Sequence, residues 1–480
     1  MSAVLDPRPL DPRELQGNIL RGYRRQKVRH LLLAVADGAA ARAWLGAVVS
    51  GDAALAPQIT SEAHWGDQKP DFCFNLGITS EGLRALGLPE SVMASFPGEF
   101  NEGMAARAVK LGDTGASAPS HWPAAFRETD KLHLIATIHA DDIAHLDAVH
   151  QRVQAAGQGR AWQVRGAVDG GSFKGDEVHF GYRDNISQPR FVGIHDPADY
   201  PDAQPLAPLG TVLLGKATAF EDLVFTPPQP AQLGLLGSFS AFRVLAQDVV
   251  GFEAYLDSAA TELLAHPLGH ELLDHASAWP AQSGLTRFAA LREVLAAKMC
   301  GRWRTGVPLA LSPDDPHAMD PTQPVPLGNF DYQDDPRGLR CPYGAHLRRC
   351  NPRGSTIVQR MANHTRRIVR RGIPYGPAYD RTQPHDGNER GLLGHFVCAN
   401  LAAQFEAIHY DWLNLGLQDP RITGSNDPLL GANDPLDSWF DMPVKSGVIR
   451  LRGLPRFVTT RGGAYLFLPS LPALRYLAGN

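Results

Sequence analysis

Hydrophobic positions recur along the first half of the chain with two different periods. Val28 to Val35, Phe72 to Ile78 and Leu132 to His139 are short runs that are continuously apolar or alternate apolar and polar residues. Such runs are typical of buried or half-buried strands. Ala39 to Val49 and Asp141 to Ala155 instead repeat apolar residues every three or four positions, which predicts helices that are apolar on one face. Strands and helices are therefore expected to alternate.

The second half repeats this order of elements. Gly237 to Leu245 predicts a strand, Val250 to Asp257 a helix, and Leu263 to Cys300 a helical insertion. The end of the chain predicts further strands and a closing helix, at Val448 to Leu451, Phe457 to Thr460, Ala464 to Leu468 and Leu471 to Leu477. Half-buried strands that are covered by helices on one side favour an α+β fold with antiparallel sheets.

The two halves are separated by residues 193–232, which are rich in Pro, Asp and Gly and end in Thr226-Pro-Pro-Gln-Pro230. This composition is typical of loops and linkers. We place the domain boundary inside this segment, with a first domain at residues 1–225 and a second at residues 226–480.

Composition narrows the classes of function. The 480 residues are 44% hydrophobic and 20% charged, as in ordinary globular proteins. A net charge of -4 gives no electrostatic argument for binding nucleic acid or a membrane surface, and we expect neither partner. Five cysteines are too few and odd in number for a disulfide framework. With no apolar leader or twin arginine at the N-terminus, a cytoplasmic location is expected.

The segment Cys341-Pro-Tyr-Gly-Ala-His-Leu-Arg-Arg-Cys-Asn-Pro-Arg353 combines one imidazole with several guanidinium groups. An imidazole can hold a transition metal, and Arg pairs with carboxylates through its planar fork. An iron porphyrin needs both kinds of partner, an axial nitrogen and cations for its propionates. Two alternatives stay open: His346 is an ordinary polar residue, or Cys341, His346 and Cys350 form a structural zinc site with His364.

Two more segments carry candidate chemistry. Asp184 lies between Arg183 and Asn185 in a turn that begins at Gly181, a position suited to a catalytic acid–base. The alternative is that Asp184 and Asn185 simply form the turn. The segment Arg366-Arg-Ile-Val-Arg-Arg-Gly-Ile-Pro-Tyr-Gly376 is a basic strand or helix end that runs into a turn, and its arginines are otherwise expected to be solvated.

Together these three segments resemble the dye-decolorizing peroxidase family, whose members are haem proteins with two ferredoxin-like domains. Residues 181–189 match the family motif Gly-x-x-Asp-Gly-Ile-Ser-Gln-Pro except at Asn185, and residues 341–353 match its proximal histidine segment except at Leu347. Arg370 opens a match to Arg-x-Gly-Ile-Pro-Tyr-Gly. Residues 15–23 and 460–470 also look like the longer bacterial members, so the resemblance covers nearly the whole chain.

The resemblance implies a fold, a cofactor and a reaction. It implies two ferredoxin-like domains with haem b in the C-terminal one, and a peroxidase that uses hydrogen peroxide to oxidise bulky phenolic or dye-like donors by one-electron steps. A non-enzymatic haem-binding or haem-trafficking protein on the same fold is the alternative, although such a protein would have no use for Asp184 and Arg370.

The resemblance also implies roles for single residues. His346 would be the axial ligand of the haem iron, and Arg353 would pair with a propionate. Asp184 would move a proton between the oxygens of hydrogen peroxide, and Arg370 would stabilise the charge that develops as the O–O bond breaks. The remaining cofactor contacts that the resemblance implies are Asn185 and Ile186.

Three departures from the family pattern also lead to expectations. Asn185 replaces a Gly, and because Asn tolerates positive φ well, the turn should survive. Gly394 and His395 replace bulky apolar residues that border the distal pocket in relatives. Asn400 stands where relatives often carry an acid that faces the proximal imidazole. Asn400 is thus expected either to face His346 or to cap the helix that begins at Leu401, and in the second case Glu406 could supply the carboxylate.

Overall fold

The computed structural model describes residues 5–49, 56–66, 68–196, 205–219, 223–274, 279, 283–355 and 365–479. The first half contains four strands: β1 (Lys27–Val35), β2 (Phe72–Ile78), β3 (Leu134–Ala140) and β4 (Trp162–Gly171). Helix α1 (Gly38–Val49) follows β1, and α6 (Ile143–Gly157) follows β3. The strands pair in the order β4-β1-β3-β2, and all pairs are antiparallel. This is the β-α-β-β-α-β arrangement of a ferredoxin-like domain.

The second half builds the same arrangement. Its strands β5 (Ser238–Gln247), β6 (Val369–Tyr375), β7 (Gly391–Cys398) and β10 (Val458–Leu468) pair in the order β10-β5-β7-β6. Helix α8 (Val249–Ala265) follows β5, and the π-helical segments η8 (Leu401–Glu406) and η9 (Ile408–Asn414) follow β7. The predicted α+β class with two ferredoxin-like units is confirmed.

The two halves form one continuous antiparallel sheet of eight strands, because β10 pairs with β2 between Phe467 and Ile78. The sheet curls so that its edge strands β4 and β6 approach each other. A Cβ on Gly170 would lie 2.7 Å from Ile373 Cγ2 and 3.0 Å from the carbonyl oxygen of Pro374. Within the described residues the two edges share no ladder of hydrogen bonds, so the curled sheet is not a closed barrel.

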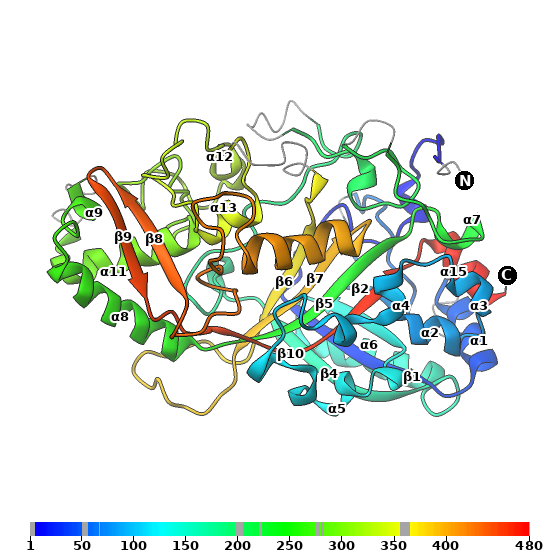
Figure 1. The fold of residues 1–480 in the computed structure, drawn as a ribbon. Helices are drawn as coiled ribbons and strands as arrows, with labels where there is room; N and C mark the ends of the chain where they lie inside the picture. The colour runs from blue at the N-terminus through cyan, green and yellow to red at the C-terminus, as the bar shows by residue number, and fades with distance from the viewer. Residues whose placement is uncertain are drawn as a thin grey trace.

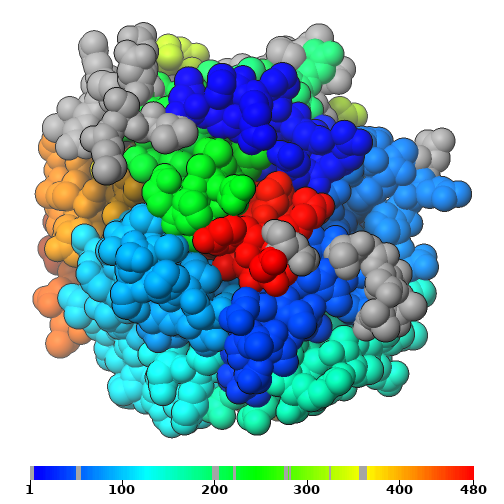
Figure 2. Space-filling view, turned by 90° about the vertical axis from the view of Figure 1, so that its right-hand side faces the viewer, coloured from blue at the N-terminus to red at the C-terminus, as the bar shows by residue number. Residues whose placement is uncertain are grey.

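The outer layers differ at the two ends of the molecule. The end of the molecule that contains the N-terminal strands is covered by helices α1, α6 and α15 (Leu471–Ala478) (Figure 1). The opposite end contains α8, α11 (Arg287–Cys300) and the hairpin of β8 (Trp439–Val444) and β9 (Gly447–Arg452). The N-terminal and C-terminal segments lie side by side on the face seen in Figure 2. Further short helices are α2 (Ser80–Ala85), α3 (Glu90–Met93), α4 (Gly98–Glu102), α5 (Ala124–Arg127), α7 (Ala231–Gly234), α9 (Glu271–Asp274), α12 (Pro324–Gly328) and α13 (His346–Cys350).

Several elements differ from the sequence-based prediction for physical reasons. Strand β4 was not predicted, because it is an edge strand whose side chains are mostly half-buried or exposed and give no apolar pattern. The two strands expected at residues 457–460 and 464–468 are one strand, β10, with an irregularity between Thr460 and Gly462. The predicted domain boundary falls between the end of β4 and the start of β5, and it stays a prediction. No helix among the described residues is long and apolar enough to cross a membrane.

The inside of the curled sheet contains histidines from three strands. His30 of β1 lies 5.2 Å from His395 of β7 and 4.8 Å from Phe242 of β5, measured between ring centres. His30 also bonds to the hydroxyl of Thr137 at 3.0 Å. Burial lowers the pKa of His395 to about 4 and that of His139 to about 3, so these imidazoles are neutral at neutral pH.

These buried imidazoles predict a loss of stability in acid. Below pH 6.5 a histidine takes up a proton in the unfolded chain but not in the folded one, until the pH reaches its lower folded pKa. The contribution of these histidines to the free energy of unfolding should therefore be complete above pH 6.5. It should decrease toward pH 4 by about 1.4 kcal/mol per pH unit for each histidine. Urea unfolding from pH 8 to pH 4 measures this slope. His395→Gln should flatten it, whereas exposed His64→Gln should not; parallel slopes in all three proteins would contradict the assignment.

Candidate active site

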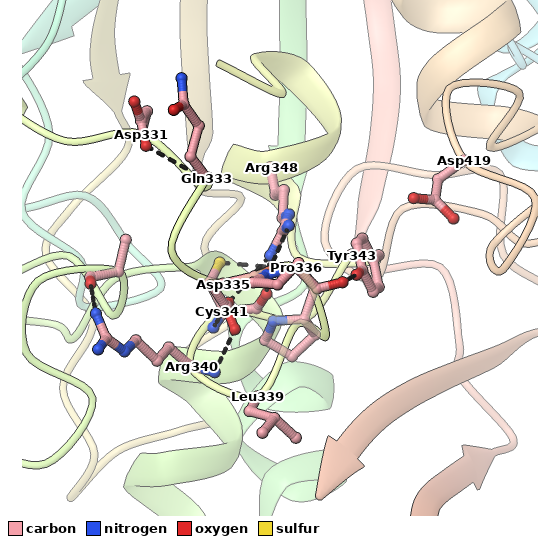
Figure 3. A network of polar contacts seen from close by, with 12 residues as sticks. Asp331, Gln333, Asp335, Pro336, Leu339, Arg340, Cys341, Tyr343, Arg348 and Asp419 are labelled. Atoms are coloured by element: carbon pink, nitrogen blue, oxygen red, sulfur yellow. Dashed lines mark hydrogen bonds and ion pairs between the residues drawn. The ribbon is translucent and has the colours of Figure 1, made fainter. Parts of the chain in front are cut away.

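The turn that presents His346 is held by a buried carboxylate. Asp335 accepts hydrogen bonds from the backbone N–H groups of Cys341 at 2.9 Å and Arg340 at 3.2 Å, and from Arg348 Nη1 at 3.1 Å. Figure 3 shows the Arg348 side chain and the backbone of Arg340 and Cys341 meeting at Asp335. Because Arg348 belongs to α13, whose first residue is His346, this network fixes the start of the helix that carries the imidazole.

The guanidinium group of Arg348 is also enclosed by aromatic rings. Its Cζ lies 4.4 Å from the centre of the Tyr332 ring and 4.3 Å from that of Tyr343. The Tyr343 hydroxyl donates to the carbonyl oxygen of Pro336 (Figure 3). Arg348 is therefore a structural support of the proximal segment, not a group that faces a ligand.

The zinc alternative receives no support. Burial raises the pKa of the Cys341 thiol to about 11. The part of the chain that the structure describes contains no group of three or more His, Cys, Asp and Glu side chains that could hold a metal ion. His364, the fourth ligand of that hypothesis, lies outside the described residues.

His346 pairs with a buried carboxylate that the sequence analysis missed. Its Nδ1 lies 3.0 Å from Oδ2 of Asp427, whose side chain is fully buried. The other oxygen of Asp427 accepts the backbone N–H groups of Leu429 at 2.9 Å and Leu430 at 2.8 Å. Burial lowers the pKa of His346, but the neighbouring Cys350 and Asp427 raise it, and the result lies well above the usual value.

Arg349 ties this pair together across the fold. Its Nη1 donates to the carbonyl oxygens of Ser425 and Trp412, both at 3.0 Å, and its Nη2 donates to the Ser425 hydroxyl. Arg349 follows His346 on α13, and Ser425 precedes Asp427. The arginine therefore fixes the distance between the imidazole and its carboxylate.

The expectation that Asn400 faces His346 is wrong. The Asn400 side chain accepts the backbone N–H of Ala403 at 2.7 Å and caps η8. Glu406 does not face the imidazole either, because its buried carboxylate binds Arg107 at 2.7 Å and the Tyr465 hydroxyl at 2.9 Å. Asp427, 81 positions from His346, takes the expected role, and its only signal in the sequence is that of a turn before Pro428.

Asp184 lies at the end of a small hairpin. Val178 and Tyr182 are hydrogen-bonded across it, and the backbone N–H of Asp184 donates to the carbonyl oxygen of Asp176 at 2.9 Å. Asn185 has a φ of 59°, so the predicted left-handed conformation is confirmed. Among the described residues the Asp184 carboxylate has no hydrogen bond or ion pair, which leaves it available to a ligand.

Arg370 on β6 is joined directly to the Asp184 segment. Its Nη2 donates to the carbonyl oxygen of Ser187 at 3.0 Å. The Gln188 amide binds the backbone of Arg370 twice, accepting from its N–H and donating to its carbonyl oxygen, both at 2.9 Å. Two of the three predicted segments therefore meet, and the backbone contacts fix the Arg370 side chain relative to Asp184.

The His346 segment is connected to the segments of Asp184 and Arg370 through residues 300–306. Helix α11 ends at Gly301, where a Cβ would lie 3.0 Å from Leu347 Cβ and 3.3 Å from Cys341 Sγ. At Gly306 a Cβ would lie 2.6 Å from Ile186 Cδ1. Segment 300–306 thus packs against the His346 segment at one end and the Asp184 segment at the other.

Arg353 is buried close to this support. Only 3% of its surface is exposed. Its Nη1 donates to the carbonyl oxygens of Gly328 at 2.8 Å and Phe330 at 2.6 Å, and its Cζ lies 3.7 Å from the centre of the Phe330 ring. A buried guanidinium at this place suits the expected pairing with a carboxylate, which stays a prediction.

His395 and Arg370 lie on opposite faces of the sheet. In the β6–β7 ladder Arg370 is opposite Phe396, whereas His395 is opposite Arg371. Cross-strand partners share a face and successive residues alternate. Gly394 and Phe396 therefore lie on the Arg370 face, and His395 faces the inside of the curled sheet. The expectation that His395 belongs to the distal surroundings is wrong for this reason.

The comparisons with known proteins agree with this geometry. Residues 14–170 match the family model described as the DyP dimeric alpha+beta barrel domain. A dye-decolorizing peroxidase of Mycetinis scorodonius is 30% identical over 96% of this chain and 86% of its own length. The chain belongs to the dye-decolorizing peroxidase family. It is therefore a peroxidase.

Other dye-decolorizing peroxidases are similar to this chain over 95% or more of their length. A multifunctional dye peroxidase of Amycolatopsis sp. is 29% identical over 97% of this chain and 95% of its own. A solved dye-decolorizing peroxidase in complex with 2,6-dimethoxyphenol is 28% identical and covers 98% of this chain and 100% of its own, with a TM-score of 0.79. The crystal structure from Auricularia auricula-judae has the same TM-score at 25% identity.

The His346–Asp427 pair leads to a prediction for the reduction potential of an iron that His346 would bind. A carboxylate that accepts the Nδ1 proton makes the imidazole a stronger electron donor. Asp427→Asn should therefore raise the ferric/ferrous potential by tens of millivolts or more, since for one electron about 59 mV corresponds to 1.4 kcal/mol. Redox titration measures the shift.

Asn400→Asp is the matched control for this experiment. Asn and Asp cap helices about equally well, and Asn400 caps η8 without contacting His346. The ferric/ferrous potential of Asn400→Asp should equal that of the wild type. A shift in Asn400→Asp with none in Asp427→Asn would reverse the assignment.

Proposed function

We propose that this dye-decolorizing peroxidase binds haem b, with His346 as axial ligand of the iron, and uses hydrogen peroxide to oxidise bulky phenolic or dye-like donors. The observation that carries the proposal is the His346–Asp427 pair. Because Nδ1 faces the Asp427 carboxylate, Nε2 is left to act as the ligand. Among the described residues, the only hydrogen-bond contact of Nε2 is with the Cys350 thiol at 3.8 Å.

The charges around the site fit the cofactor. Haem b carries two propionates, and the site contains buried guanidinium groups at Arg353 and Arg302. Nη2 of Arg302 is buried without a hydrogen-bond partner in the described part of the chain. A buried donor without a partner is costly, and an anionic group that binds there removes the cost. The donor set, one carboxylate-bonded imidazole and several arginines, is the set that an iron porphyrin requires.

Asp184 and Arg370 are proposed to act on the peroxide. Asp184 would accept the proton of one peroxide oxygen and return it to the other, which then leaves as water. Arg370 would stabilise the negative charge that develops on the departing oxygen. Its side chain is held for this by the Ser187 carbonyl oxygen. When bound, haem supplies the redox chemistry by which the donors are oxidised one electron at a time.

The presence of both groups favours an enzyme over a haem carrier. A carrier needs the axial histidine and a propionate partner, but no acid–base. Here Gln188 joins Arg370 to the Asp184 segment by two hydrogen bonds at 2.9 Å, an arrangement that a carrier would not require. Phenolic donors are proposed because a similar solved peroxidase binds 2,6-dimethoxyphenol.

A reducing, cytoplasmic environment is also proposed. The five cysteines, Cys73, Cys300, Cys341, Cys350 and Cys398, are all free thiols. Burial raises the pKa of the Cys73 thiol to about 11, and Cys300 and Cys398 shift in the same direction for the same reason. Unpaired, protonated cysteines are typical of proteins in reducing compartments.

Removal of the axial ligand tests the cofactor assignment. His346→Ala should lose specific haem ligation, because the only nitrogen that the Asp427 carboxylate orients is removed. Absorption spectra after haem reconstitution measure this loss. A variant that keeps full haem content and an unchanged Soret band would show that another residue is the ligand.

Removal of the acid–base tests the reaction. Asp184→Asn should react with hydrogen peroxide roughly 10²–10⁴-fold more slowly, the usual loss when a positioned acid–base is removed. Stopped-flow absorbance of the haem-loaded protein measures the rate. Asp176→Asn removes another carboxylate of the same hairpin and should keep the wild-type rate. Equal rates in all three proteins would exclude Asp184 as the proton carrier.

A further inference from the structure

Arg302 lies between the segments that form the proposed active site. It belongs to segment 300–306, which contacts the His346 segment at Gly301 and the Asp184 segment at Gly306. Only 5% of its surface is exposed. Its Nη1 donates to the carbonyl oxygens of Gly306 and Leu327, both at 2.8 Å. These two bonds fix the guanidinium plane and therefore the direction of its other amino group.

That other amino group has no partner. Nη2 of Arg302 is buried and makes no hydrogen bond in the described part of the chain. Neither Arg302 nor Arg370 forms an ion pair with a described carboxylate. Burial, followed by the positive charges of Arg353 and Arg370, lowers the pKa of Arg302 to about 10. The protein thus holds a buried cation beside other cations, which costs free energy unless an anion binds there.

Arg302 and Arg353 share one platform. The Cζ of Arg302 lies 5.4 Å from the centre of the Phe330 ring, and that of Arg353 lies 3.7 Å from it. Arg302 donates to the carbonyl oxygen of Leu327, and Arg353 to those of Gly328 and Phe330. Residues 327–330 therefore orient two buried guanidinium groups together.

We propose that Arg302 is a second carboxylate-binding arginine of the cofactor site, which donates from Nη2 to a propionate of haem while Arg353 binds the propionates from the same platform. The inference rests on the proposed function and deepens it, because it names a residue that the sequence motifs do not assign. Two guanidinium groups match two carboxylates in number and charge, and the fork geometry of Arg suits this pairing.

A comparison of haem with its dimethyl ester tests the proposal. Both cofactors present the same iron and ring, but the ester has no carboxylates. Arg302→Gln keeps an amide donor for the carbonyl oxygens of Gly306 and Leu327. It should release haem roughly 10- to 100-fold faster than the wild type, the range for a hydrogen bond to a charged group. With the dimethyl ester, the wild type and Arg302→Gln should release the cofactor at equal rates. Transfer to excess apomyoglobin measures these rates without reference to peroxidase activity.

Three controls separate this role from a structural one. The cofactor-free Arg302→Gln protein should unfold at the same temperature as the cofactor-free wild type or higher, because a buried uncompensated charge has been removed. Arg302→Lys keeps the charge and should lie between the wild type and Arg302→Gln for haem, with no difference for the ester. Arg304→Gln alters a neighbour that pairs with Glu253 at 3.0 Å, and it should change haem and ester release by the same factor.

Two outcomes would overturn the proposal. If Arg302→Gln and Arg302→Lys accelerate release of haem and of the ester equally, Arg302 supports the fold and not the carboxylates. If haem release is unchanged while KM rises for anionic donors but not for neutral ones, the arginine binds substrate anions instead. Failure of the proposed function itself would be distinguishable, because the wild type would then bind neither haem nor the ester specifically.

Discussion

The hydrogen bond between His346 and Asp427 is the interaction on which the rest of the site depends. A fully buried carboxylate is stable only if its oxygens are bonded, and Asp427 bonds to the imidazole and to two backbone N–H groups. Because the same bond occupies Nδ1, it leaves Nε2 as the nitrogen to which the proposed function assigns the iron. Arg349 then joins α13 to the segment that carries Asp427, so the pair cannot separate without breaking several buried hydrogen bonds.

The remaining parts of the site are held relative to this pair by one short segment. Residues 300–306 begin at the C-terminal end of α11, where Gly301 adopts a left-handed conformation with φ of 94° and packs against the proximal turn. At the other end, the backbone carbonyl oxygen of Arg304 accepts a hydrogen bond from the backbone N–H of Arg183 at 3.0 Å. The segments of His346 and Asp184 therefore share a support, although these two residues are 162 positions apart in the sequence.

The sequence predicted those features that depend on neighbouring residues, but not those that depend on contacts made only in the folded chain. Strands such as β1 and β3 were predictable because their buried faces repeat apolar residues, whereas the edge strand β4 has no such face. The left-handed Asn185 was predictable because few residues tolerate that conformation. The sequence left two roles open for Asn400, because Asn suits a helix cap and a polar site equally well, and the structure shows the cap. Asp427 and Arg302 could not be found, because only the folded chain places them beside His346 and Arg353.

The departure at Gly394 shows how the fold compensates for a lost side chain. Gly394 pairs with Gly372 across the β6–β7 ladder, on the same face as Arg370. A Cβ on Gly394 would lie 3.0 Å from Cε2 of Phe396, so the Phe396 ring leans over the space that a bulky residue at position 394 would fill. Phe396 is itself held by Phe405 at 5.5 Å between ring centres. Aromatic bulk beside Arg370 is thus kept but comes from two positions further along the strand, while the β6 side, at Gly372, stays free of side chains. The surface next to Arg370 is therefore shaped by one ring from one side, a form that the family motif alone does not specify.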